Sequence, residues 1–230
     1  MQKYHKIDTL FEREENGNHA LIMGKYRNPA VEQAKDLKWV FTEKVDGTNI
    51  RIYWDGHKVY MNGRTDNAQL HVDLVTHIQG KFCTEDVEQV FEQKFGEKEV
   101  HLFGEGYGAG IQKGGSYSEP KSFILFDVKV GSVYLNREDV EGLAEVFDVP
   151  VVPVLLEGTV DEGIEYVRTH KNSVLGDKTH ELEGVVGRLK EEMFDRFGNR
   201  MIVKLKRRDL CKMESKKQNE SNIKHIKSNS

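Results

Sequence analysis

Short segments in which apolar and polar residues alternate recur along this chain, and they restrict its possible folds more than any other feature of the sequence. Residues 50–54 follow the two-residue period of a half-buried strand, and Asp55-Gly56 supplies a hairpin turn before a second such segment at 57–61. Further strands are expected at 99–103, 123–130, 149–156, 182–189 and 201–207. These patterns predict a fold that is rich in strands.

One segment follows a helical period instead. Its apolar residues lie three or four positions apart between Val87 and Phe95, Thr84 is suited to cap its first turn, and Gly96 is suited to end it. A chain of 230 residues is long enough to bury one sizeable core. Strands and a helix in such a chain predict the α+β class.

The apolar runs and the cysteines argue against a membrane span, a signal peptide, a zinc site and a disulfide framework. The longest apolar stretches, such as 149–156, fall far short of the roughly 20 residues that span a bilayer. Residues 1–10 lack the apolar core of a signal peptide. Cys83 and Cys211 lie far apart, without the spacing of a zinc site or a disulfide framework. We therefore expect a cytoplasmic protein, in the host cytoplasm if the chain is viral.

The net charge of −4 argues against binding nucleic acid through overall basicity, but it permits a local basic patch. Cationic side chains cluster near the C-terminus, at Lys204, Lys206, Arg207, Arg208 and Lys212. Alone, such a run is equally typical of a solvated strand edge. Lys204 and Lys206 carry more information, because alternate residues of a strand lie about 6 to 7 Å apart on one face and could together hold phosphates.

Three other polar residues lie where a ligand could reach them. Lys44 stands between two expected strands, where Gly47 lets the backbone approach a ligand, although a lysine in a turn is usually solvated. Glu105 follows a strand in the glycine-rich stretch 104–110, for which a surface loop and a site for a sugar hydroxyl are both open interpretations. Glu183 stands beside a glycine in an apolar strand, so that it faces water or binds a cation such as Mg²⁺.

Taken in order, these segments resemble the motifs of the covalent nucleotidyltransferase superfamily, which contains DNA ligases, RNA ligases and mRNA capping enzymes. The matching segments are Lys44-Val45-Asp46-Gly47, Asn62-Gly63-Arg64-Thr65, Phe103-Gly104-Glu105-Gly106, 123–128, Glu183-Gly184-Val185-Val186 and Val203-Lys204-Leu205-Lys206. Asn49 and the FxxFDV form of the fourth segment resemble the phage RNA ligase 2 group. Asp46 stands where many members of that group carry histidine, and it resembles a DNA ligase equally.

This resemblance implies a mechanism. Lys44 would attack the α-phosphate of ATP, expel pyrophosphate and carry AMP, which would pass to a 5'-phosphate end before a 3'-hydroxyl displaces it. Lys204 and Lys206 would hold the α-phosphate and keep the Lys44 amine deprotonated. Mg²⁺, or alternatively Mn²⁺, would screen the phosphates with Glu183 near it.

The resemblance also implies a set of nucleotide contacts. Phe126 would stack on adenine, with core packing as its alternative role, and Glu105 would accept a hydrogen bond from the ribose. Arg64 and Asn49 would contact phosphate. The implied nucleotide-binding residues are Glu43, Val45, Asn49, Arg64, Glu105, Phe126, Glu183, Lys204 and Lys206.

The implied fold is a nucleotidyltransferase catalytic domain of antiparallel sheets flanked by helices, which is similar to ATP-grasp folds. We expect it over residues 39–208, with 1–38 packed on its core and 209–230 forming a polar, disordered tail. Relatives add an OB-fold or a C-terminal helical domain, and the residues that follow Lys206 are too few for either. A protein partner could supply such an end-binding module.

An ATP-dependent RNA ligase of RNA repair is the primary interpretation, acting on nucleic acid with 5'-phosphate and 3'-hydroxyl ends, as RNA or as a nicked duplex. A DNA ligase, a GTP-dependent capping guanylyltransferase and a protein that binds nucleic-acid ends without turnover are the alternatives. The expected lack of an OB-fold weighs against the capping enzyme. The end-binding protein is disfavoured by the intact set of Lys44, Glu105, Glu183, Lys204 and Lys206.

Overall fold

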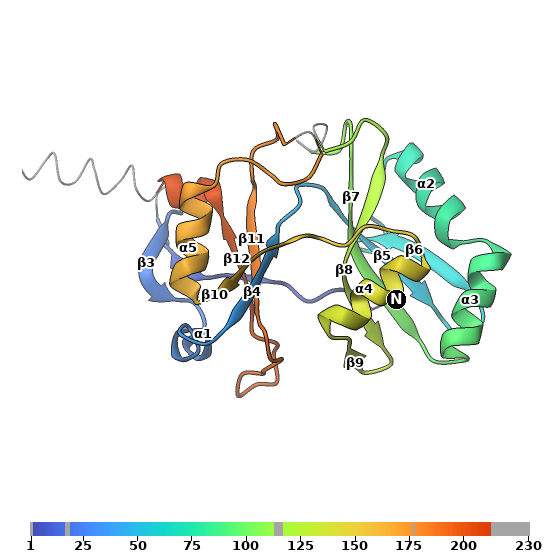
Figure 1. Ribbon diagram of the computed structural model, residues 1–230, viewed down its shortest axis with the longest axis horizontal. Coiled ribbons are helices and arrows are strands. Elements are labelled where there is room, and N and C mark those ends of the chain that lie inside the picture. The colour runs from blue at the N-terminus through green and yellow to red at the C-terminus, as the bar shows by residue number, and fades with distance from the viewer. Residues whose placement is uncertain (1, 17–18, 113–116, 177, 213–230) are drawn as a thin grey trace, which may run out of the picture. The chain divides into compact units, whose positions relative to one another are not determined.

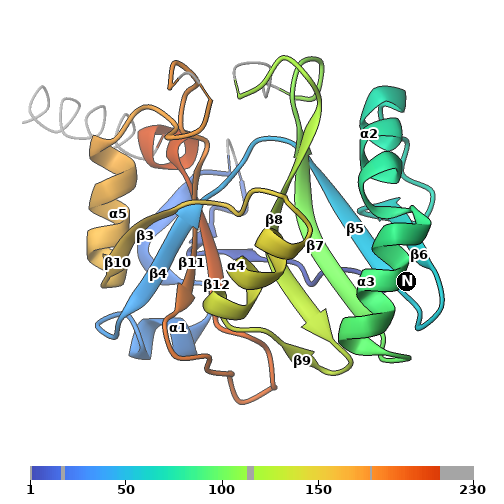
Figure 2. The ribbon, with the colours of Figure 1, turned by 45° about the vertical axis from the view of Figure 1, so that its right-hand side comes forward.

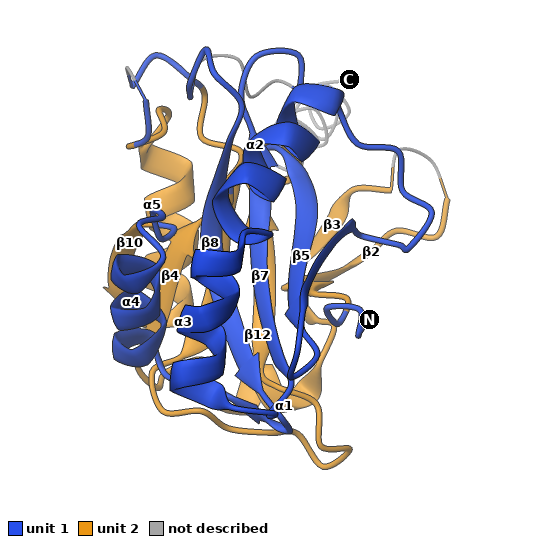
Figure 3. Ribbon diagram, turned by 90° about the vertical axis from the view of Figure 1, so that its right-hand side faces the viewer, with its two compact units in different colours: residues 1–5, 45–152, 175–180 blue, residues 6–44, 153–174, 181–230 orange. Residues whose placement is uncertain are grey.

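The computed structural model describes residues 2–16, 19–112, 117–176 and 178–212. The chain forms two compact units, and each combines stretches that lie far apart in the sequence (Figure 3). Unit 1 takes residues 1–5, 45–152 and 175–180, and unit 2 takes residues 6–44, 153–174 and 181–230. The chain passes from unit 2 to unit 1 between Lys44 and Val45, directly after the expected nucleophile.

Unit 1 is built on one antiparallel sheet with the strand order β6-β5-β7-β8-β9 (Figure 1). The strands are β5 (Thr48–Trp54), β6 (Val59–Gly63), β7 (Val100–Tyr107), β8 (Ser122–Val130) and β9 (Val133–Tyr134). Ile50, Ile52 and Trp54 of β5 are buried, as their alternation predicted. The expected hairpin of β5 and β6 is therefore confirmed.

Helices pack on the face of this sheet that carries those buried side chains (Figure 2). They are α2 (Val72–Phe82), α3 (Glu85–Phe95) and α4 (Arg137–Val146). The predicted helix is confirmed in α3, where the Thr84 hydroxyl accepts a hydrogen bond from the Val87 N–H and Gly96 ends the helix. Phe91 of α3 stacks on Trp54 of β5 with 5.6 Å between ring centroids, so that helix and sheet share one core.

Unit 2 contains a sheet in the order β1-β12-β11-β4-β10 and a separate hairpin of β2 and β3. Its strands are β1 (Asp8–Thr9), β2 (Phe11–Arg13), β3 (Leu21–Tyr26), β4 (Trp39–Glu43), β10 (Val154–Gly158), β11 (Gly184–Leu189) and β12 (Ile202–Lys206). β1 runs parallel to β12, and the other pairs are antiparallel. Helices α1 (Pro29–Gln33) and α5 (Val160–Thr169) share a core with this sheet that includes Trp39 and Phe41.

These sheets and helices confirm the α+β class with antiparallel sheets flanked by helices. One boundary differs from expectation, because β7 continues through Tyr107 and takes residues 104–107, expected to form a loop, into the sheet. A Cβ atom on Gly104 would lie 2.2 Å from the Phe123 ring, so that glycine here permits close packing between β7 and β8. No helix in the described ranges is long and apolar enough to cross a membrane.

The strand expected at 149–156 was wrong in its position. β10 begins only at Val154, and the residues before it make a short bridge to β8 instead. The Leu125 N–H donates to the Pro150 carbonyl at 2.8 Å, and the Val152 N–H donates to the Leu125 carbonyl at 2.9 Å. The apolar run therefore covers a passage from unit 1 into unit 2 and only the first part of a strand.

The first residues of the expected tail pack in unit 2. Asp209 and Leu210 are buried in unit 2, and Asp209 pairs with Arg13 at 2.6 Å. The part of the expected tail at 213–230 lies outside the described residues. The expected domain bounds of 1–38 and 39–208 stay a prediction.

Candidate active site

Lys44 follows directly after β4, beside the start of β11. Its N–H donates to the Gly184 carbonyl at 3.0 Å, which continues the ladder beyond the pair of Glu43 and Val185. Its Nζ atom lies 2.6 Å from Oε2 of Glu183. The antiparallel register of β4 and β11 thus brings together two residues separated by 139 positions in the sequence.

Glu183 holds two lysines at once. Its other oxygen, Oε1, lies 2.6 Å from Nζ of Lys206, because the register of β11 and β12 pairs Gly184 with Lys206. The side chain of Glu183 is 14% exposed, and those of Lys44 and Lys206 are 23% and 19% exposed. Water therefore screens the two ion pairs only in part. The cations that Glu183 faces are two of the expected site lysines.

Gly184 allows this arrangement because a side chain at that residue would meet the backbone of β12. A Cβ atom on Gly184 would lie 2.1 Å from the carbonyl oxygen of Leu205. Any larger residue would push the two strands apart and move Glu183, the preceding residue, away from Lys206.

Lys204 shares one face of β12 with Lys206, whereas Val203 and Leu205 are buried in the core of unit 2. Burial lowers the pKa of Lys204, and the positive charges of Lys206 and Lys44 lower it further. Lys44 and Lys206 share the single negative charge of Glu183, so that the three lysines leave a net positive charge that attracts an anion such as a phosphate.

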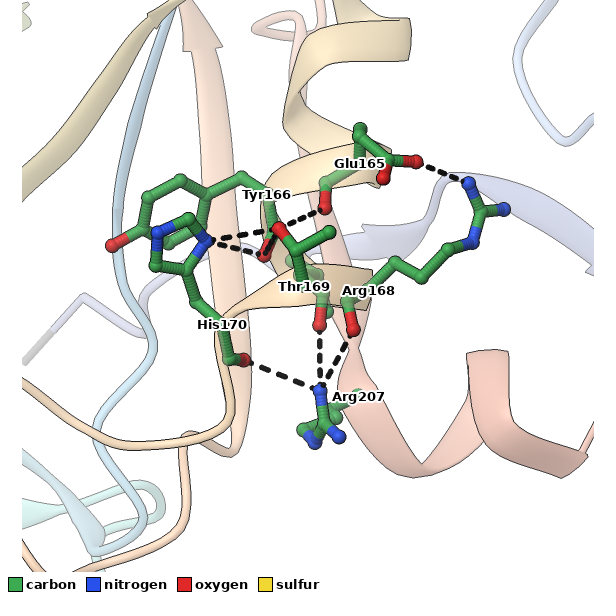
Figure 4. Close-up of polar contacts among 7 residues, drawn as sticks. Glu165, Tyr166, Arg168, Thr169, His170 and Arg207 are labelled. Carbon is green, nitrogen blue, oxygen red and sulfur yellow. Dashed lines mark hydrogen bonds and ion pairs between the residues drawn. The ribbon is translucent and has the colours of Figure 1, made fainter.

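Arg207 fixes the end of the strand that carries these lysines (Figure 4). Its Nη1 atom donates to carbonyl oxygens at the end of α5, those of Val167, Arg168 and His170, at 2.9, 3.3 and 3.2 Å. The backbone N–H of Arg207 donates to the Glu183 carbonyl at 2.9 Å. A cation is favoured at the C-terminus of a helix, where carbonyl groups lack partners. Arg207, which the sequence assigned to a basic patch, therefore joins α5 to the strands of the site.

Glu43 is buried directly before the expected nucleophile, with 1% of its surface exposed. Its carboxylate accepts hydrogen bonds from the Ser173 hydroxyl and from the Val174 N–H, the latter at 3.1 Å. These contacts fix the end of β4, and a role of Glu43 in nucleotide binding stays a prediction. No sequence pattern marks Ser173, because its contact spans 130 positions.

Other expected nucleotide-binding residues lie in unit 1. Asn49 and Glu105 are directly opposite each other on β5 and β7, and both are partly exposed. They occupy the face of the sheet opposite to the buried Ile50. Arg64 follows β6 and is exposed, whereas Val45 is buried in a small apolar cluster.

A β-bulge in β8 determines where the Phe126 side chain points. The pairing of β8 with β7 shifts by one residue between Leu125 and Asp127, so that Phe126 is the extra residue. Phe126 and Asp127 both contact Tyr4, whose hydroxyl donates to Asp127 at 2.8 Å and whose ring centroid lies 5.1 Å from that of Phe126. Phe126 remains partly exposed, and its stacking on adenine stays a prediction.

The expected site residues divide between the units. Unit 2 holds Glu43, Lys44, Glu183, Lys204 and Lys206, and unit 1 holds Val45, Asn49, Arg64, Glu105 and Phe126. In the part of the chain that is described, no group of three or more His, Cys, Asp or Glu side chains could hold a metal ion by itself. Mg²⁺ commonly takes one or two carboxylates and completes its shell with substrate phosphates and water. Both oxygens of Glu183 pair with lysines in this structure, so a metal ion shared between Glu183 and substrate phosphates stays a prediction.

Comparison with known proteins shows which fold and which family this chain shares. RNA ligase structures from Naegleria gruberi have a similar fold: the complex with PPi aligns with a TM-score of 0.59 at 20% identity, over 77% of this chain and 52% of that chain. A lysine-to-alanine mutant with ATP and Mn aligns with a TM-score of 0.60 at 18% identity, over 87% and 58%. This chain thus spans about half the length of that enzyme. No curated protein sequence matches it. The family model for RNA ligase matches residues 37–206, and the chain therefore belongs to the RNA ligase family.

Proposed function

We propose that this chain is an ATP-dependent RNA ligase in which Lys44 carries AMP as a covalent intermediate. The observation that supports this most is the Glu183 carboxylate between Lys44 and Lys206, with one oxygen 2.6 Å from each amine. A lysine in this setting has a base beside it and further cations that attract a phosphate. Family membership agrees with the proposal, as do the Naegleria RNA ligase structures that contain ATP, AMP and Mn.

In the first step the Lys44 amine attacks the α-phosphorus of ATP. A P–N bond forms, the P–O bond to the β-phosphate breaks, and pyrophosphate leaves. The amine must lose a proton, and Oε2 of Glu183, which accepts a hydrogen bond from Nζ, would take it. Lys204 and Lys206 would stabilise the negative charge that develops on the phosphate oxygens.

In the later steps AMP passes from Lys44 to the 5'-phosphate of an RNA end or of a nick. The 3'-hydroxyl then attacks that phosphorus, a phosphodiester bond forms, and AMP leaves. Mg²⁺ or Mn²⁺ held by Glu183 and the phosphates would supply further positive charge against these oxygens. The remaining roles follow the family motifs: Phe126 stacks on adenine, Glu105 accepts from the ribose, and Arg64 and Asn49 contact phosphate.

The proposal also covers the substrate and the partners of this chain. In this proposal the chain, which spans 52% of the Naegleria RNA ligase chain, forms the lysine adduct itself. We include in the proposal an RNA substrate with 5'-phosphate and 3'-hydroxyl ends and a protein partner that supplies an end-binding module. We place this activity in RNA repair in the cytoplasm, as the sequence suggested.

The test is the intact mass of the protein after incubation with ATP and Mg²⁺, compared with GTP and Mg²⁺. Lys44→Ala removes the proposed nucleophile. Lys190→Ala is the matched control, because Lys190 also lies beside β11 but pairs with the exposed Glu157 at 2.9 Å. The expected result is one AMP adduct in the wild type and in Lys190→Ala, and none in Lys44→Ala or with GTP.

Other outcomes select among the alternatives. A GMP adduct would identify a capping enzyme, and no adduct with either nucleotide would leave a protein that binds nucleic-acid ends. Sealing of nicked DNA but not of nicked RNA by the adenylylated protein would identify a DNA ligase.

A further inference from the structure

The loop that follows Lys44 is held in place residue by residue within unit 1. Val45 is 4% exposed and packs in an apolar cluster with Tyr117 and Ile124. A Cβ atom on Gly47 would lie 2.3 Å from the carbonyl oxygen of Gly106, so that this part of the loop lies tightly on β7. Between these two residues, the loop is held by a hydrogen bond to its backbone.

That hydrogen bond comes from Tyr117. The N–H of Asp46 donates to the Tyr117 hydroxyl at 3.2 Å. Tyr117 is only 6% exposed, and its ring lies 4.1 Å from the ring of His180, centroid to centroid, and 5.9 Å edge-on from that of Tyr107. Packing on several sides fixes the ring, and the ring in turn fixes the hydroxyl.

The contacts of Tyr117 reach two segments that end in the proposed catalytic machinery. Asp46 stands two residues after Lys44, and His180 stands three residues before Glu183. Lys44 and Glu183 are the partners of the 2.6 Å ion pair. One buried side chain therefore contacts both the loop that leaves the nucleophile and the segment that leads to its carboxylate partner.

We propose that Tyr117 is a positioning residue for the formation of lysyl-AMP: its hydroxyl holds the Asp46 amide and thereby sets the direction in which the Lys44 side chain leaves the backbone. The inference rests on the proposed function. Attack of an amine on phosphorus requires the reacting atoms to approach closely and in line, so that a small rotation of the supporting loop is costly. Tyr117 acts on the attacking group through the backbone and contributes no binding energy for ATP.

The test is Tyr117→Phe, which removes the hydroxyl and keeps the ring against His180. The rate of adduct formation at saturating ATP should fall about fivefold to tenfold, as expected for the loss of one hydrogen bond that orients a reacting group. The KM for ATP should stay within about twofold, since ground-state binding is unchanged. Tyr53→Phe is the matched control, because its hydroxyl donates to Glu99 at 2.8 Å elsewhere in unit 1 and should not affect the reaction.

A second readout does not depend on catalysis. In Tyr117→Phe the Asp46 amide should exchange its hydrogen faster than in the wild type, while the amides of β5 keep their protection. Unchanged exchange at Asp46 together with an unchanged adduct rate would refute the positioning role. An equal loss of rate in Tyr53→Phe would attribute the effect to general destabilisation and would also refute it. If the wild type forms no adduct, the proposed function fails and the positioning role fails with it, whereas an adduct in the wild type together with an unchanged rate in Tyr117→Phe overturns the positioning role alone.

Discussion

Replacement of Glu183 with glutamine tests how much its two ion pairs, with Lys44 and Lys206, stabilise unit 2. The substitution keeps the shape of the side chain but leaves the ammonium groups of Lys44 and Lys206 without their shared anion, next to Lys204. These side chains are 14% to 23% exposed, between a fully buried and a surface pair. Breaking a buried pair costs about 3–5 kcal/mol and a surface pair about 0–1 kcal/mol, so we expect a loss of about 2 kcal/mol.

A loss of this size corresponds to a fall in Tm of about 4–8 °C for a chain of this length. The assay is thermal unfolding of Glu183→Gln at pH 7, with Glu157→Gln as the matched control. Glu157 also pairs with two lysines, Lys38 and Lys190, at 2.9 Å each, but all three side chains are 38% to 58% exposed. The control should lower Tm clearly less, because water screens its pairs. Equal falls in Tm for the two variants would refute the argument from burial.

Three further predictions concern stability. His101 is buried and its pKa is lowered from 6.5 to about 4, so that between these pH values the unfolded chain binds a proton there that the folded chain does not. The free energy of unfolding should therefore fall as the pH drops from about 6.5 to about 4. Urea unfolding measured over this pH range should show a smaller fall for His101→Phe. In α2 a Cβ atom on Gly80 would meet no atom within 4 Å, so that Gly80→Ala should raise the free energy of unfolding by about 0.5–1 kcal/mol. A Cβ atom on Gly184 would meet a carbonyl oxygen at 2.1 Å, so that Gly184→Ala should lower it by about 2 kcal/mol or more in the same urea assay. Arg207→Met removes three hydrogen bonds to the end of α5 and should lower Tm, with faster amide exchange confined to α5 and β12; loss of protection throughout the chain would contradict a local role.

Local patterns in the sequence were sufficient for the parts of the molecule that depend on neighbouring residues. The period of Ile50, Ile52 and Trp54 identified a strand and its buried face, and Thr84 and Gly96 identified the two ends of α3. The two-residue period of a strand places alternate side chains on one face, and the capping residues of a helix lie next to the turns they cap, so that neighbouring residues along the chain determine both features. The motif series likewise indicated the family, which the match over residues 37–206 confirmed.

Contacts between distant residues were decided only by the tertiary structure. The sequence could place Glu183 beside a cation, but the register of β11 with β4 and β12 determined that this carboxylate takes both Lys44 and Lys206. Tyr117 carries no local pattern that marks its hydrogen bond to Asp46, which spans 71 positions. Strand register and close packing are satisfied by the whole sheet at once, so that no single segment of sequence encodes which side chains finally meet.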